Sequence, residues 1–144
     1  ANYSWTGPNG FTSTLQNPTL TATANSAGTY SVVAINPVTG CSSGQSSTVV
    51  VVNQSVAGTA SSDQTICTGT QPADITLTGN TGTIQWQVSS DNNDFANISG
   101  ATSATLTAAQ MGTLTATRYY RAVVTSGVCS SATSNAVTVT VNAL

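Results

Sequence analysis

Apolar and polar residues alternate along several short stretches of this chain, and Gly, Asn and Ser separate the stretches. The longest alternation covers residues 117–125, where Tyr120, Ala122 and Val124 fall on one face of an extended strand and Arg121 falls on the other. A period of two predicts strands that are buried on one side. In the second half of the chain, the pattern predicts strands near 59–66, 75–77, 84–88, 95–98, 105–108, 117–125 and 137–141.

The chain contains two copies of one sequence pattern. The matched blocks are residues 3–5 with 84–86, 11 with 95, 19–22 with 105–108, 30–34 with 120–124, 41–43 with 129–131 and 50–53 with 139–142. Because all the blocks follow in the same order, they indicate a tandem repeat with a period of roughly 80–90 residues.

The predicted strands favour an all-β fold of tandem immunoglobulin-like Greek-key β-sandwiches, the first incomplete at its N-terminus. Residues 1–53 are a partial repeat that lacks its first strands, because nothing in them matches residues 59–83. Residues 54–58 are a short linker, which predicts a stiff string of modules. Residues 59–144 are a complete repeat. Since the chain opens inside a predicted strand, we expect it to be an internal piece of a longer exported protein.

The amino-acid composition limits the classes of function that we expect for this chain. Of the 144 residues, 39% are hydrophobic but only 4% are charged, against about 25% in an average protein. The chain has no His, Lys or Glu, which excludes Ser-His-Asp catalysis and His/Cys zinc sites. Two arginines form no basic patch. We therefore expect neither an enzyme nor a nucleic-acid-binding protein, and the lack of a run of about 18 apolar residues predicts no membrane insertion.

Three cysteines suggest an oxidising compartment. Cys67 follows the first strand of the second copy and Cys129 follows the strand at 117–125, so both could lie at one end of a sandwich. A Cys67–Cys129 disulfide would close a loop of about 60 residues and contribute about 4 kcal/mol in the chain-entropy model. The alternative is two free buried thiols. We expect Cys41 to pair with a residue outside this chain.

The aromatic residues have a structural interpretation and a functional one. Tryptophan and tyrosine on the apolar faces of strands favour packing in the sandwich core. The alternative is a platform on which sugars stack, for which the better candidates are Tyr119 and Tyr3. The predicted core anchors are Trp5, Trp86, Tyr30 and Tyr120.

Two polar clusters are candidate binding sites. Asp91, Asn93 and Asp94 bring side-chain oxygens into one turn, which makes calcium the one candidate cofactor, although Asp and Asn are also ordinary turn formers. Arg118 and Arg121 flank Tyr119 and Tyr120. With no Lys in the chain, we expect the arginines to pair with an Asp or to stack on a Tyr across the sheet. The alternative is that Tyr119 and the two arginines contact a sulfate or carboxylate ligand.

Several motifs resemble the immunoglobulin-like/PKD-like repeats of very large surface proteins in gliding and biofilm-forming Bacteroidota, including SprB-type gliding adhesins. In the second copy these motifs are residues 63–69, 79–87, 98–102 and 119–124, and in the first copy 3–11 and 40–42. The resemblance covers nearly the whole chain and brings no catalytic residues with it. It is not specific for one protein, because similar modules also occur in secreted hydrolases.

The resemblance implies a location on the extracellular cell surface, export by the type 9 secretion route and tandem copies in a filament. The expected function is therefore that of a non-catalytic repeat segment of a large surface adhesin, with stiff modules that serve attachment, gliding or biofilm formation. Its expected partners are neighbouring repeats of the same polypeptide, surface glycans or other filament chains. The alternative is a carbohydrate-binding or spacer module of a secreted polysaccharide-degrading enzyme.

Overall fold

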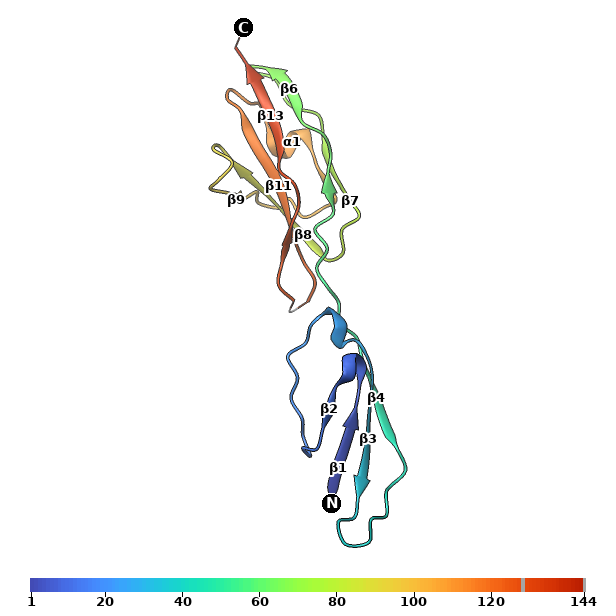
Figure 1. Cartoon of the computed structure of the whole chain (residues 1–144). Helices are drawn as coiled ribbons and strands as arrows, with labels where there is room; N and C mark the ends of the chain where they lie inside the picture. The colour runs from blue at the N-terminus through green and yellow to red at the C-terminus, as the bar shows by residue number, and fades with distance from the viewer. Residues whose placement is uncertain (128, 144) are drawn as a thin grey trace. The chain divides into compact units, whose positions relative to one another are not determined.

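A computed structural model describes residues 1–127 and 129–143 of the chain. The chain divides into two compact units, Ala1–Asn53 and Gln54–Leu144, here called unit 1 and unit 2 (Figure 1). Each unit is described by itself. Part of the expected linker belongs to unit 2, because the backbone groups of Val56 and Thr81 exchange two hydrogen bonds of 3.1 Å.

Unit 2 contains a large sheet and a small one. In the large sheet the order is β6 (Gln64–Cys67), β13 (Val137–Asn142), β11 (Arg118–Thr125), β8 (Thr83–Ser89) and β9 (Ala96–Asn97), and β12 (Ala132–Thr133) also pairs with β11. β11 is antiparallel to its neighbours, so Tyr120 lies opposite both Val88 and Val137. β6 differs from the others because it runs parallel to β13.

The small sheet consists of β10 (Thr105–Leu106), β7 (Ile75–Thr78) and β5 (Thr59–Ala60). Its inward side chains are as deeply buried as those of the large sheet: Ile75 and Leu106 are 0% exposed. A short helix, α1 (Ala108–Met111), follows β10. Both sheets contribute to one core, whose buried members are Ala60, Ile75, Leu77, Trp86, Ala101, Leu106, Met111, Leu114, Tyr120, Ala122, Val124, Val137 and Val139. This arrangement confirms the predicted all-β sandwich fold.

Unit 1 has a single sheet. Its strands follow the order β2 (Thr12–Ser13), β1 (Asn2–Thr6), β3 (Gly28–Ile35) and β4 (Ser46–Val50), with the 3-10 turns η1 (Pro8–Gly10) and η2 (Ala24–Ser26) beside them. Of the unit 1 side chains that the structure describes, those of Tyr30 and Ser26 are buried. The Tyr30 ring packs on the backbone of Gly7, where an added Cβ would lie 2.5 Å from the ring, and meets Phe11 edge-on with centroids 5.3 Å apart.

One predicted strand of the second copy is in fact two. The stretch predicted at 59–66 is divided by residues 61–63, so that β5 joins the small sheet and β6 joins the large one. Because of this switch, one short segment provides an edge strand to each of the two sheets. Sequence alternation misses it because both pieces continue the same extended pattern.

The predicted Cys67–Cys129 disulfide is not formed in the structure. Cys67 lies opposite Asn142, beyond the start of β11, because Val139 of the same strand already lies opposite Arg118. Cys129 follows the other end of β11. Eight residues of β11 separate the two ends, a span of roughly 25 Å, whereas disulfide-bonded Cα atoms lie about 4.4–6.8 Å apart.

The error in the disulfide prediction has a topological cause. β6 is parallel to β13 and therefore antiparallel to β11. The C-terminal ends of β6 and β11, which the two cysteines follow or occupy, therefore lie at opposite ends of the strands in the sheet. Figure 1 shows β6 beside the C-terminal end of β13. Cys41 and Cys67 are exposed thiols.

Candidate functional site

The expected core anchors of unit 2 lie on the inner face of the large sheet. Trp86 and Tyr120 are 0% and 1% exposed. The Trp86 indole Nε1 donates a 2.9 Å hydrogen bond to the carbonyl of Ser103, so its one polar atom is satisfied inside the core. Burial raises the pKa of Tyr120, and the charge of Arg118 partly offsets this. These side chains are positioned for packing, with no path to a ligand.

The same positions recur in unit 1. Trp5 lies opposite Val32 of β3 just as Trp86 lies opposite Ala122 of β11. The Trp5 indole also donates to a loop carbonyl, that of Leu15, at 3.0 Å. Tyr30 of unit 1 is buried, with its hydroxyl donating to the Ser26 carbonyl at 2.9 Å. Trp5, however, is half-buried.

Tyr119 and Arg121 lie on the outer face of β11, whereas Arg118 lies at the start of the strand on the same face as Tyr120. All three candidate ligand contacts are half-buried. From the sequence we expected Arg121 to pair with an aspartate or to stack on a tyrosine. In the structure its partners are different. Its guanidinium carbon lies 3.9 Å from the centroid of the Phe95 ring, and its Nε donates to Oε1 of Gln87 at 2.9 Å. Arg118 donates to the carbonyl of Thr117 at 3.3 Å. Both arginines thus bind groups of their own unit.

The candidate calcium ligands lie in the turn between β8 and β9. Oδ1 of Asp91 accepts hydrogen bonds from the Ser89 hydroxyl and from the backbone N–H groups of Asn93 and Asp94, at 2.7–2.9 Å. These bonds lower the pKa of Asp91 from its usual 3.8 to about 2. The carboxylate therefore stabilises its own turn. No cluster of three or more His, Cys, Asp or Glu side chains occurs among the residues that the structure describes.

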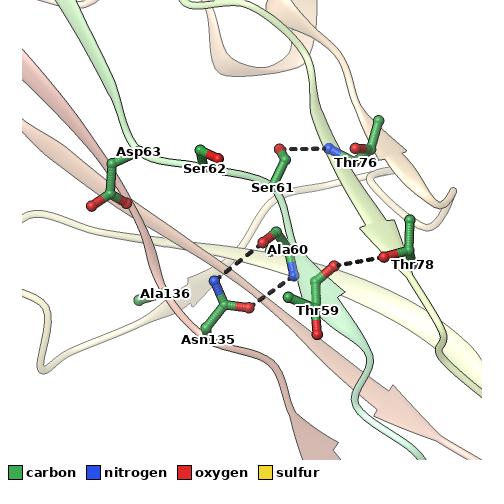
Figure 2. Close-up of a pocket in the computed structure, with 9 residues that line it drawn as sticks. All are labelled: Thr59, Ala60, Ser61, Ser62, Asp63, Thr76, Thr78, Asn135 and Ala136. Atoms are coloured by element: carbon green, nitrogen blue, oxygen red, sulfur yellow. Dashed lines mark hydrogen bonds between the residues drawn. The ribbon is translucent and has the colours of Figure 1, made fainter.

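A polar groove of about 630 Å³ lies beside the β5 edge of the small sheet (Figure 2). It is lined by Thr59, Ala60, Ser61, Ser62, Asp63, Thr76, Thr78, Asn135 and Ala136. Many of its polar atoms already have partners: Ser61 Oγ accepts from the Thr76 N–H at 3.2 Å, and Asp63 Oδ1 accepts from the Thr138 N–H at 2.8 Å. Asp63 is the one ionisable side chain among the lining residues, so the groove lacks a second group for acid–base chemistry.

Asn135 is a structural residue that the sequence analysis missed. Its Oδ1 accepts from the Ala60 N–H at 2.8 Å, and its Nδ2 donates to the Ala60 carbonyl at 3.2 Å. The side-chain amide thereby takes the place of a neighbouring strand at the β5 edge (Figure 2). The neighbouring Ser134 has a similar role on β11, where its hydroxyl accepts from the Ala122 N–H at 2.9 Å and its own N–H donates to the Ala122 carbonyl at 2.9 Å.

Ser43 of unit 1 repeats this serine arrangement. Its hydroxyl accepts from the Ala34 N–H at 3.0 Å, and its N–H donates to the Ala34 carbonyl at 2.8 Å. The hydroxyl then donates to the next carbonyl in the chain, as that of Ser134 does, both at 2.8 Å. In sequence the only sign is a serine a few residues after each matched cysteine, which is too common in this chain to stand out.

Unit 1 has one further concave surface. The side chains of Tyr3, Trp5, Tyr30, Val32, Ala34, Thr48 and Val50 share one face of its sheet, here called the open face. The loop at 14–27 bounds part of this face and leaves a hollow of about 390 Å³, lined mainly by apolar groups that include Trp5, Phe11, Leu20 and Val50. No charged side chain lines this hollow.

The fold and these sites define a class: tandem β-sheet units whose prominent side chains hold their own strands together. Residues 56–143 match a family described as a domain of unknown function, DUF8696. Because the match spans more than half of the chain, the chain belongs to this family. No curated protein matches the chain. Among the described residues, no helix has the length and apolar character needed to cross a membrane.

Proposed function

We propose that this chain is a non-catalytic repeat segment of a large secreted surface adhesin or filament. The observation that carries the proposal is the way its polar side chains are used. Asp63, Asp91, Asn135 and Arg121 each bind backbone or side-chain groups of their own unit. Side chains bound in this way stabilise their own turns and strand edges, which supports a structural role.

The repeat also supports a role as a module in series. The register of Trp5 with Val32 matches that of Trp86 with Ala122, so two consecutive segments share one construction. Repeated β-sheet units with few charges suit an extracellular scaffold. The cell-surface location rests on the resemblance to gliding adhesin repeats alone, since Cys67 and Cys129 do not form the expected bridge.

Surface labelling tests this proposal. Antibodies raised against residues 54–144 should label unpermeabilised cells that produce the full-length protein, and their Fab fragments should reduce attachment of those cells to glass. An unrelated Fab is the control. Labelling that requires permeabilisation, or unchanged attachment despite surface labelling, would contradict the location or the adhesive role respectively.

The alternative, a carbohydrate-binding module, makes a different prediction. Tyr119 is half-buried on the outer face of the large sheet and is the candidate for sugar stacking there. If the chain binds glycans on an array and Tyr119→Ala abolishes that binding, the carbohydrate-binding function replaces the structural one. We expect no such binding at this residue.

A further inference from the structure

Three polar side chains form one row across the outer face of the large sheet in unit 2. Arg121 of β11 lies opposite Gln87 of β8, and Gln87 lies opposite Asn97 of β9. Cross-strand partners of this kind project from the same face of a sheet. The side chains are also joined to one another: Arg121 Nε donates to Gln87 Oε1 at 2.9 Å, and Gln87 Nε2 donates to Asn97 Oδ1 at 2.8 Å. The row therefore holds the arginine at one end by a chain of hydrogen bonds.

The Arg121 guanidinium is held from a second side as well. Its central carbon lies over the Phe95 ring, 3.9 Å from the ring centroid. A free arginine side chain loses rotamer entropy when it binds a ligand. Here the contacts with Phe95 and Gln87 restrict the side chain before any ligand arrives. The guanidinium is therefore preorganised.

Most of the hydrogen-bond donors of Arg121 are unused. Within its unit it donates through Nε alone, and its terminal nitrogens Nη1 and Nη2 have no hydrogen-bond or ion-pair partner among the described residues. Arg121 is half-buried. In the described part of the chain, no half-buried or buried residue has a fully buried side-chain nitrogen or oxygen without a partner. Both terminal nitrogens are therefore open to solvent, on a guanidinium whose orientation is already fixed.

Two neighbouring amides add free hydrogen-bonding atoms on the same face. Asn97 is exposed, and its Nδ2 makes no hydrogen bond with the described residues. Gln85 donates through Nε2 to the carbonyls of Trp86 and Ile98, at 2.9 Å and 2.8 Å, which leaves its Oε1 free to accept. Gln85 lies two residues from Gln87 along β8, a span of about 7 Å. A charged donor, a neutral donor and a neutral acceptor thus lie close together.

This set of groups specifies the chemistry of a ligand. The planar fork of a guanidinium matches the two coplanar oxygens of a carboxylate. The amides of Asn97 and Gln85 match hydroxyl groups, which both donate and accept. An acidic polypeptide fits less well, because the edge strand β9 has only two residues and gives an extended peptide little backbone to pair with. A uronic acid carries the carboxylate and the hydroxyl groups on one ring.

We propose that the outer face of unit 2 binds an acidic polysaccharide, in which the carboxylate of a uronic acid is held by Nη1 and Nη2 of Arg121. The free amide atoms of Asn97 and Gln85 bind hydroxyl groups of the same chain. Phe95 and Gln87 position the guanidinium and do not touch the ligand. The inference names a partner for the adhesive segment and in that respect rests on the proposed function.

A matched pair of ligands tests the proposal. The probe is an oligosaccharide of galacturonic acid, and its control is the same oligosaccharide with the carboxyl groups methyl-esterified. Each is titrated into the isotope-labelled 144-residue chain at low salt with EDTA, and NMR follows the Nε–H signal of Arg121. We expect saturable shifts with the acid and none with the ester, which cannot form an ion pair. This requirement for charge distinguishes the site from neutral-sugar stacking on Tyr119.

Arg118 provides a matched variant, because it carries the same charge on the other face of β11. Arg121→Gln removes the charge-assisted hydrogen bonds and should weaken binding by about tenfold or more. Arg118→Gln loses the same charge and should leave binding nearly unchanged. Asn97→Asp keeps the acceptor for Gln87 but adds a negative charge to the row, so it should also weaken binding. Circular dichroism checks that the variants remain folded.

Several results would overturn the proposal. One is an absence of saturable binding of the acidic oligosaccharide. Another is equal binding of the methyl ester, because the ligand would then be a neutral sugar. Equal losses in Arg118→Gln and Arg121→Gln would indicate a general attraction to positive charge, and tighter binding of a glutamate peptide would assign the face to an acidic polypeptide. Because binding is measured on the purified chain, its failure would leave the result of the cell-surface labelling unaffected.

Discussion

Trp5 and Trp86 hold the same register position in their two sheets, yet Trp86 is 0% exposed and Trp5 is only half-buried. Each indole donates to a loop carbonyl, at 3.0 Å and 2.9 Å. What differs is the layer above: the small sheet of unit 2 covers Trp86, and unit 1 has no such sheet among its described residues. The chain therefore carries one closed and one open copy of a single repeat.

This difference in burial predicts unequal effects of truncation. Trp86→Ala should lower the free energy of unfolding of unit 2 by about 3–5 kcal/mol, because it leaves a cavity in a closed core. Trp5→Ala is the matched control, and it should leave the unit 2 transition unchanged. Urea denaturation followed by circular dichroism measures both. Comparable destabilisation of unit 2 by the two substitutions would contradict the division into units.

The position of Cys67 predicts how the chain responds to oxidants and reductants. Cys67 is an exposed thiol at the far end of the sheet from Cys129, so we expect iodoacetamide to alkylate it in the native protein without prior reduction. Intact-mass spectrometry detects this, with Cys67→Ser as the control. The melting temperature of unit 2 should be the same with and without dithiothreitol. A clear fall on reduction would mean that a disulfide forms after all.

Asp91 predicts a specific pH dependence. Its pKa is lowered from 3.8 to about 2 by hydrogen bonds that it accepts in its own turn. A lowered carboxyl pKa contributes stability that is present above pH 3.8 and is lost as the pH falls through about 2. Asp91→Asn should therefore flatten the stability curve between these values. An NMR titration in which the Asp91 carboxyl titrates near 4 would contradict the hydrogen-bonded turn.

Asn135 offers a test of edge protection. Asn135→Ala removes both hydrogen bonds to Ala60 and leaves backbone groups of β5 unpaired, which should cost about 1–3 kcal/mol of unfolding free energy. Asn97→Ala removes an exposed bond to Gln87 and should change stability by about 0.5 kcal/mol or less. If urea denaturation gives the same small change for both variants, the amide of Asn135 is not important for the edge.

The long strands of unit 2 were predictable because their burial alternates over many residues. β8, β11 and β13 each show the period of two in sequence, and their inner residues are buried or partly buried in the core. The helix α1 was not predicted, although Thr107 and Gln110 form a capping box that is visible in sequence. Four helical residues are too few to produce a helical period.

The contacts between strands were the harder part. Sequence alternation places Cys67 at the end of a strand, but it does not indicate that this strand runs parallel to β13. The strand direction decides at which end of the sheet's strands the thiol lies. Likewise, nothing near Arg121 in the sequence indicates that Phe95 and Gln87 are its partners. Direction and pairing are tertiary properties, which the local pattern leaves undetermined.

Hydrogen exchange on the intact chain tests most directly whether unit 1 is an open copy of unit 2. Amides of β8 and β11 lie in a closed sandwich and should exchange only by global unfolding of unit 2. Amides of β1 and β3 lie in a sheet with one open face, so we expect them to exchange about tenfold faster or more. Equal protection of the two pairs of strands would contradict this, because it would mean that unit 1 is closed by itself.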